Sequence, residues 1–394
     1  MPEPPRYPGR IRTDETNPFA HHTMRVRVPA ILRNVLARNP DYAADIARAV
    51  EALALRLESD GALPPLGGAA PGAEATREAL ARRAGERWLH TDWFFAETYA
   101  YRQLIERVRF WETLRDPFFA IKAEEYASPA HASAFDRTLA LGGPRDERLH
   151  ALFGAALFGN RIDLSFQASL ERGLEAAHDD LLVDDRSAAV RLMLDGSGPL
   201  HLIVDNAGTE LTLDLVLADF ALHELGVPVV LHLKEHPTFV SDATVTDVRR
   251  FLGLHGEPFV KALSRDARTC TGRLAEALGG GRLELAPHAF WNGPESLWAL
   301  PAELAARFAG ARLVVLKGDA NYRRAVGDAL WPAETPFVHV TAAFPAPLLA
   351  LRTNKSDPIV GLAPGRAQAL DGVDVGWRVN GKRGVACLGG KVGV

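Results

Sequence analysis

The sequence predicts an α/β fold, in which a mainly parallel, Rossmann-like sheet is flanked by helices and follows a helical N-terminal region. After about residue 197, short apolar runs alternate with helical patterns, and this alternation predicts right-handed crossovers between parallel strands. Before that point, apolar residues recur every three or four positions, as on one face of a helix. We therefore expect a flexible lead-in over 1–18, a mainly helical region over 19–196 and an α/β domain over 197–394.

The helical region divides at turn-forming residues. Two helices are predicted over 28–57, with a turn at Asn39-Pro40 between them. The glycine- and proline-rich stretch 61–72 is predicted to be a loop, and 77–110 returns to a helical pattern. The latter contains an aromatic-dense band over 88–101, which we expect to pack a core.

Five short β-like runs follow residue 197, and three helical segments lie among them. The predicted strands are 202–204, 227–233, 283–285, 312–316 and 337–340. The predicted helices are 211–225, 243–251 and 301–308. We expect ligands in the crevice beyond the carboxyl ends of these strands, as in other open α/β sheets.

Composition sets the class of protein. The 394 residues are 47% hydrophobic and 24% charged, as in an ordinary globular protein, and favour two domains or one large one with an appendage. A net charge of −4 argues against a nucleic-acid-binding surface, and no run approaches the roughly 18 apolar residues that span a membrane. Two isolated cysteines and a proline-rich, polar start without a signal peptide predict a cytoplasmic protein. The sequence leaves the oligomeric state open.

Polar residues follow two of the predicted strands. Asp205 and Asn206 come directly after 202–204, and Asp242 stands before a helical pattern that follows 227–233. If these strands are neighbours, two carboxylates and one amide oxygen form an incomplete shell suited to Mg²⁺ or Mn²⁺. The alternative is that Asp205 or Asn206 only caps the next helix.

A third predicted strand ends in a cation. Lys317 follows 312–316 and is expected to point into the same crevice, with Asp319, Asn321 and Arg323 adding a carboxylate, an amide and a guanidinium. Charges at strand ends are usually just solvated, and that is the alternative for each of them. Three charged turns after three strands of one sheet nevertheless favour a functional crevice.

Two further cations, Arg352 and Lys355, stand three apart on a predicted loop or short turn. Guanidinium and ammonium groups both bind phosphate oxygens. The sequence lacks the motifs of three other kinds of site. It has no GxxxxGK[ST] loop for nucleotide phosphates, no GxGxxG after a strand for a dinucleotide and no GxSxG elbow of a serine hydrolase. A zinc pair of His232 and His236 would need a helix, which the strand pattern and Pro237 oppose.

Taken together, the motifs resemble the metal-dependent damage-control phosphatases, in the subgroup with an Arg-Thr-x-Lys signature that includes acidic residue methyltransferase-like proteins. The resemblance runs through nearly the whole chain. The matching segments are ERWLHTDWFFAETYAYR (86–102), FGNRIDLS (158–165), VDNAGTELTLDLVLADF (204–220), FVSDATVTD (239–247), HAFW (288–291), LKGDANYR (316–323) and LRTNK (351–355).

The resemblance implies a role for each matching residue. Asp205, Asn206 and Asp242 would be the metal ligands, for Mn²⁺, Mg²⁺, Co²⁺ or Ni²⁺. Lys317 and Arg352 would reach the phosphate. The other expected substrate-binding residues are Glu210, Asp319, Asn321, Tyr322, Arg323, Lys355 and, at a helix end where local capping is the alternative, Asn160. Ala320 and Asn354 depart from the usual pattern and leave substrate choice open.

These residues predict metal-assisted hydrolysis of phosphate monoesters of small metabolites, and the resemblance implies sugar phosphates such as fructose 1-phosphate or fructose 6-phosphate. Asp242 or Glu210 would take the proton of the attacking water. One alternative is methyl transfer from S-adenosylmethionine to protein glutamate carboxylates, although the glycine-rich turn usual for that cofactor is absent after 202–204. A non-catalytic module that binds a phosphorylated metabolite is the other.

Overall fold

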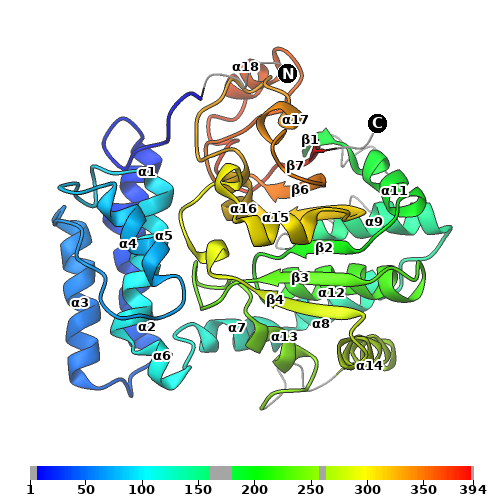
Figure 1. Ribbon diagram of the computed structural model, residues 1–394, viewed down its shortest axis with the longest axis horizontal. Coiled ribbons are helices and arrows are strands. Elements are labelled where there is room, and N and C mark those ends of the chain that lie inside the picture. The colour runs from blue at the N-terminus through cyan, green and yellow to red at the C-terminus, as the bar shows by residue number, and fades with distance from the viewer. Residues whose placement is uncertain (1–6, 160–179, 257–262, 392–394) are drawn as a thin grey trace.

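The computed structural model describes residues 7–159, 180–256 and 263–391. Their centre is a seven-stranded sheet in the order β1-β7-β6-β5-β2-β3-β4 (Figure 1). The strands are β1 (Leu181–Asp184), β2 (Leu200–Ile203), β3 (Val229–Leu233), β4 (Leu283–Pro287), β5 (Leu313–Lys317), β6 (Pro347–Thr353) and β7 (Gly384–Gly390).

Five of these strands, from β6 through β5, β2 and β3 to β4, run parallel to one another. β7 pairs with β6 in the antiparallel sense, and β1 pairs in parallel with β7. The predicted α/β class with a mainly parallel sheet is therefore confirmed. From β2 the chain moves to β3 and β4 on one side of the sheet, and β5 and β6 lie on the other side. The boundary between β2 and β5 is thus the topological switch point, where ligands bind in such sheets.

Helices cover both faces of the sheet, because alternate strand residues point to opposite faces. Leu202 and Val315 belong to the core beneath the helices α8 (Pro129–Leu139), α9 (Arg145–Phe158), α11 (Arg186–Asp195), α12 (Thr209–His223) and α14 (Arg265–Gly279). Ile203 and Val314 belong to the opposite core, with α15 (Ala302–Phe308), α16 (Gly318–Ala325), α17 (Phe337–Val340) and α18 (Arg366–Asp371). α7 (Phe119–Tyr126) and α13 (Val245–Phe251) complete this part.

The first helices pack around a core of their own, beside the sheet (Figure 1). They are α1 (Pro18–His22), a π-helical turn (Thr23–Arg27), α2 (Val28–Arg38), α3 (Ala44–Glu58), α4 (Ala73–Ala81), α5 (Trp93–Arg107) and α6 (Phe110–Thr113). The aromatic band of 88–101 lies in this core, as predicted: Trp88, Trp93 and Tyr99 are buried. Because β1 and three sheet-covering helices precede residue 197, the sheet draws on both predicted regions, and the domain boundaries stay a prediction.

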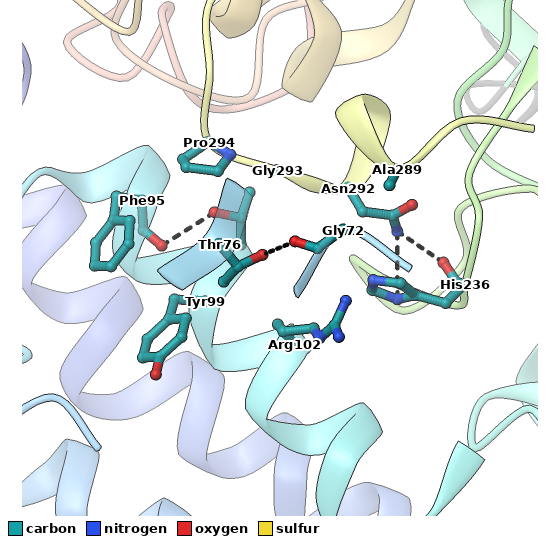
Figure 2. A pocket seen from close by; sticks show the side chains of 11 residues that line it. Gly72, Thr76, Phe95, Tyr99, Arg102, His236, Ala289, Asn292, Gly293 and Pro294 are labelled. Atoms are coloured by element: carbon teal, nitrogen blue, oxygen red, sulfur yellow. Dashed lines mark hydrogen bonds between the residues drawn. The ribbon is translucent and has the colours of Figure 1, made fainter. Parts of the chain in front are cut away.

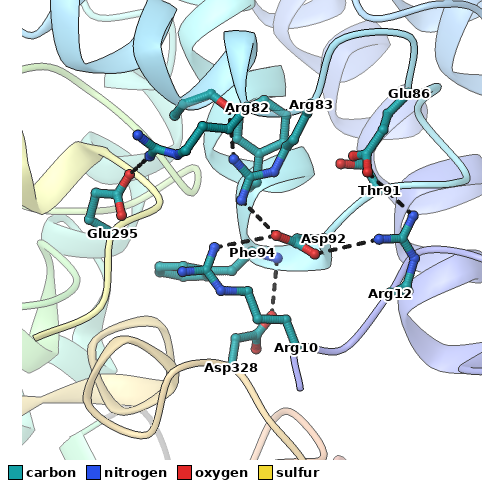
Figure 3. A network of polar contacts seen from close by, with 12 residues as sticks. Arg10, Arg12, Arg82, Arg83, Glu86, Thr91, Asp92, Phe94, Glu295 and Asp328 are labelled. Carbon is teal, nitrogen blue, oxygen red and sulfur yellow. Dashed lines mark hydrogen bonds and ion pairs between the residues drawn. The ribbon is translucent and has the colours of Figure 1, made fainter. Parts of the chain in front are cut away.

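A polar network joins the N-terminal helices to the rest of the chain (Figure 3). Asp92, just before α5, forms ion pairs with Arg83 at 2.6 Å and with Arg10 at 3.3 Å. Beside it, the Phe94 N–H donates to Asp328 Oδ2 at 3.0 Å. Asp328 follows α16, so these contacts fix α5 against the helix that follows β5.

Two local predictions were wrong. Residues 337–340 form the short helix α17, because Pro336 directs the chain and Phe337 stacks on Tyr322, with ring centroids 5.9 Å apart. Arg352 lies in β6 rather than on a loop, since Leu351 and Arg352 pair with β7. In the part of the chain that the structure describes, no helix combines the length and apolar character required for a membrane span.

Candidate active site

The turn after β2 carries Asp205 and Asn206, and backbone contacts tie it to the loop that carries Asp242. Asn206 and Asp242 form an isolated antiparallel bridge. The Ala243 N–H donates to the Asp205 carbonyl oxygen at 2.7 Å. The structure therefore brings the three residues predicted as metal ligands to one corner of the sheet, after the neighbouring strands β2 and β3.

The two carboxylates of this corner are buried. Burial raises the pKa of Asp205, and repulsion from Asp242 and Glu210 adds to that shift. Burial likewise raises the pKa of Asp242, whose Oδ2 lies 3.2 Å from Lys234 Nζ. Asp205 Oδ2 accepts a hydrogen bond from Asn206, whereas Oδ1 is buried without a partner. A buried carboxylate oxygen among like charges is costly unless a cation is bound, so these donors fit a divalent metal.

The donor set is incomplete by itself. Among residues 7–159, 180–256 and 263–391, no three histidine, cysteine, aspartate or glutamate side chains gather as a metal cluster. Two aspartates and an asparagine would supply three oxygen ligands to a divalent ion, so further ligands from outside this set would be needed.

The Asn206 amide is held on both sides. Its Nδ2 donates to Asp205 Oδ2 and to Glu210 Oε2, each at 3.0 Å. Its Oδ1 accepts from Ser241 Oγ at 2.7 Å.

Neither Asp205 nor Asn206 caps α12, so the local-capping interpretation is wrong. The N-cap is Gly208, with φ 81°, and the Thr209 N–H donates to the Glu125 carboxylate at 2.8 Å. A glutamate from α7 thus serves the helix terminus, and the side chains after β2 remain turned to other partners.

Lys317, at the end of β5, is buried among acceptors. Its ammonium group donates to the Ala156 carbonyl oxygen and to Glu210 Oε1 at 3.0 Å, and lies 3.1 Å from Asp214 Oδ1. Burial would lower the pKa of Lys317, but Asp214 and Glu210 outweigh it and the pKa is raised. Two hydrogen bonds and the ion pair with Asp214 enclose the ammonium group, so in this structure Lys317 supports Glu210 rather than facing the crevice.

Gly318 lets the backbone after β5 lie directly against the Asp205 side chain at the switch point. Its φ is +83°, and a Cβ built there would lie 1.9 Å from Asp205 Oδ2. Only glycine tolerates both the left-handed backbone and this proximity. The absence of a side chain at Gly318 therefore leaves the space that the Asp205 carboxylate occupies.

Sequence reasoning missed two buried lysines. Lys234 donates to the Trp291 carbonyl oxygen at 2.8 Å and pairs with Asp242, and burial lowers its pKa. Lys122 donates to the Asp242 carbonyl oxygen at 3.0 Å. Lys234 directly follows β3 and Lys317 is the last residue of β5, and this repeated lysine at a strand end was a usable signal. Lys122 lies far from Asp205 and Asp242 in the sequence, and no pattern there pointed to it.

The residues expected on α16 divide into two groups. Asn321 donates to the Lys317 and Val204 carbonyl oxygens at 2.9 and 3.2 Å, and so links β5 to β2. Arg323 points elsewhere: it pairs with Asp328 at 2.7 Å and with Glu97 of α5. Both partners are buried, and Arg323 therefore fastens the N-terminal helices to α16.

Arg352 is likewise enclosed by protein groups. It donates to Asp319 Oδ1 at 2.7 Å and to the Ser356 carbonyl oxygen at 2.6 Å, and lies 4.3 Å from the centre of the Tyr322 ring. Burial raises the pKa of Asp319, but the charges of Arg352 and Arg323 and a hydrogen bond with Ser356 together outweigh it, so the pKa is lowered. The Tyr322 hydroxyl accepts from the Val360 N–H at 3.0 Å.

Lys355 is the exposed cation of the set. Its N–H donates to Asp319 Oδ1 at 3.2 Å, and its side chain forms no hydrogen bond or ion pair with the residues that the structure describes. Its charge acts to lower the pKa of both Asp205 and Glu210. An exposed ammonium group whose charge acts on the acidic corner is suited to hold an anionic ligand there. Asn160 lies outside the described residues.

The two histidines of the zinc alternative do not share a site. His232 contacts His201, with ring nitrogens 2.8 Å apart. His236 instead lines a cavity of about 20 Å³ between α5 and the loop after β4 (Figure 2), where its carbonyl oxygen accepts from Asn292 at 2.8 Å. Such a volume holds about one water molecule, so this cavity is too small for a metabolite.

Comparison with known proteins identifies the class as phosphatases. The chain belongs to the ARMT1-like damage-control phosphatases, because the family model described as "Damage-control phosphatase ARMT1-like domain" matches residues 23–370. A rat protein named Damage-control phosphatase ARMT1 is 31% identical over 79% of this chain and 77% of its own length. The human protein of that name is 29% identical over 76% and 74%. A DUF89 family protein from Pyrococcus horikoshii aligns structurally with TM-score 0.48, 17% identity and coverage of 92% and 97%.

The predicted family and the predicted enzyme class are thereby confirmed. The chain is a phosphatase acting on small phosphorylated metabolites, in a family whose members are generally dependent on divalent metals. The non-catalytic alternative is set aside.

Proposed function

We propose that the chain hydrolyses the monoesters of sugar phosphates, such as fructose 1-phosphate or fructose 6-phosphate, with a divalent metal held by Asp205, Asn206 and Asp242. The observation that carries the proposal is the buried Asp205 carboxylate, with one oxygen unpartnered and with Asp242 and Glu210 raising its pKa. A divalent cation would offset this concentration of negative charge.

The proposed division of labour follows from the contacts. When bound, Mn²⁺, Mg²⁺, Co²⁺ or Ni²⁺ supplies Lewis-acid polarisation of a phosphate oxygen and acidifies a water molecule. Lys355, exposed and unpaired among the described residues, would bind phosphate oxygens directly. Asn321, Tyr322 and Asp319 would shape the substrate pocket.

Three predicted phosphate or substrate contacts take an indirect role in this proposal. Lys317, Arg352 and Arg323 are buried and paired with carboxylates, so they would hold other groups in place. Glu210 or Asp242 would accept the proton of the attacking water. Glu210 is the one whose pKa is lowered, since Lys317 and Lys355 outweigh its burial, and it is therefore ionised at neutral pH.

The test is release of inorganic phosphate from a panel of sugar phosphates, with Mn²⁺ or with a chelator. We expect Asp205→Ala and Asp242→Ala to abolish metal-dependent release while circular dichroism shows a folded chain. Asp41→Ala is a matched control, because Asp41 is an exposed acid paired with Arg115 in the loop between α2 and α3. Undiminished hydrolysis by either active-site variant would overturn the proposal.

The cytoplasmic location stays a prediction. Both cysteines, Cys270 and Cys387, are buried free thiols. A fractionation experiment on cells that express the natural protein would test the location directly.

A further inference from the structure

We propose that Asp214 is a positioning residue of the active site, which acts through Lys317 and Glu210 to fix the Asn206 amide beside Asp205. The inference rests on the proposed function, since it gives Asp214 a task at the metal corner. Asp214 was not among the residues expected from the sequence.

A continuous chain of contacts, which runs from the buried Asp214 to the half-buried Asn206, carries the inference. Asp214 Oδ1 lies 3.1 Å from Lys317 Nζ, and Lys317 Nζ lies 3.0 Å from Glu210 Oε1. On its other side, Glu210 Oε2 accepts from Asn206 Nδ2 at 3.0 Å, and the same nitrogen donates to Asp205 Oδ2 at 3.0 Å. Each member of this relay therefore has a neighbour within hydrogen-bonding distance.

The position of Asp214 makes an indirect role the only one open to it. Its side chain is fully buried, one helical turn beyond Glu210 in α12. The rest of that helix is largely apolar and packs in the core. A buried acid so placed does not meet substrate, and any influence on the metal corner must pass through Lys317.

Lys317 needs two acids to stay where it is. It donates to the Ala156 carbonyl oxygen and to Glu210, and the Asp214 charge holds the ammonium group as an ion pair at 3.1 Å. Without the Asp214 charge, Lys317 would draw closer to Glu210 and shift the carboxylate that orients Asn206. Groups behind metal ligands commonly set ligand geometry in this way.

A purely structural ion pair would behave differently. Asp219 provides the comparison within the same helix: it is buried and pairs with Arg273 at 3.0 Å, away from the metal corner. Loss of that pair should lower stability and leave metal binding unchanged. Loss of the Asp214 charge should weaken metal binding even in a folded protein.

The experiment measures Mn²⁺ binding by titration calorimetry, without substrate, on the full chain at pH 8. Burial raises the pKa of Asp214 to about 7, so its carboxylate is mostly ionised at that pH. We expect Asp214→Asn to raise the Kd for Mn²⁺ about 10- to 100-fold, and Asp219→Asn to leave it within twofold of the wild-type value. We also expect excess Mn²⁺ to restore part of the lost kcat of Asp214→Asn.

If Asp214→Asn does not fold, Asp214→Leu replaces the acid with an apolar group and leaves the Lys317–Glu210 ion pair in place. It too should bind Mn²⁺ at least tenfold more weakly. A wild-type Kd in either folded variant, or equal weakening by Asp219→Asn, would overturn the inference alone. Absence of Mn²⁺ binding by the wild-type chain would instead overturn the proposed function, and the inference with it.

Discussion

Gly318→Ala is the sharpest test of the geometry at the switch point. The added methyl group would lie 1.9 Å from Asp205 Oδ2, 2.2 Å from its Cγ and 2.7 Å from its Cβ. A van der Waals contact needs about 3.5 Å, so either the Asp205 side chain or the start of α16 must move. Both movements separate Asp205 from its place beside Asn206.

The cost of this substitution has two parts. Leaving a non-glycine residue at a φ of +83° costs about 1–2 kcal/mol, and overpacking a filled site costs about 1–3 kcal/mol more. We therefore expect the free energy of unfolding to fall by roughly 2–5 kcal/mol, in urea denaturation. Mn²⁺ affinity and phosphate release should fall with it, by about 100-fold or more if the ligand is displaced by 1 Å.

Gly310→Ala is the matched control. Gly310 has nearly the same φ, +84°, but a Cβ there meets nothing within 4 Å. This variant should lose only about 1–2 kcal/mol of stability and keep wild-type Mn²⁺ affinity and activity. If Gly318→Ala bound Mn²⁺ as tightly as Gly310→Ala, our assignment of Asp205 to the metal would be wrong.

Three further predictions follow from single residues. Lys355→Ala should raise KM for a sugar phosphate about tenfold. It should change the free energy of unfolding by less than about 0.5 kcal/mol, because the exposed Lys355 side chain is unpaired among the described residues. An unchanged KM would exclude Lys355 from the phosphate site. Arg323→Met leaves Glu97 and Asp328 as buried, unpaired acids and should lower the free energy of unfolding, measured in urea, by about 3–5 kcal/mol. A loss below about 1 kcal/mol would contradict the role of Arg323 in joining the N-terminal helices to α16. Burial raises the folded-state pKa of Asp214 from 3.8 to about 7, so the folded protein binds this proton more tightly than the unfolded chain does. The resulting contribution to the free energy of unfolding is fully present below pH 4 and is lost as the pH rises to 7. Wild-type stability should therefore fall by roughly 4 kcal/mol relative to Asp214→Asn across that window, and parallel pH profiles of the two proteins would refute the shift.

Four strands of the sheet, β2, β3, β4 and β5, correspond to predicted strands. β1 and β6 were missed, although Leu-Leu-Val in β1 and Pro-Leu-Leu-Ala-Leu in β6 are also apolar. β7 is Gly-Val-Ala-Cys-Leu-Gly-Gly, whose small residues give little periodic signal. It fits between neighbours because bulk is excluded there: a Cβ at Gly389 would lie 2.3 Å from Thr341 Oγ1. That constraint exists only in the folded structure.

The candidate site could be predicted from the sequence only as far as the order of the strands in the sheet could be predicted. Asp205 and Asp242 follow consecutive parallel strands, so a general rule of α/β sheets brings their turns together. The partners of Arg323 obey no such rule, since Glu97 lies 226 residues away in another core. Asp214 looked like one more residue of an apolar helix until Lys317 was seen beside it.

The pairing of β1 with β7 has a consequence for how the chain is made. β1 joins the sheet through a strand that follows it by 203 residues, as between Leu181 and Gly384. During synthesis on the ribosome, β1 and the outer edge of β6 must both wait for β7, with their backbone groups open to other chains. Nascent chains halted before residue 384 should therefore need chaperones, whereas the Asp205 corner, complete once β5 and α16 emerge, could assemble earlier.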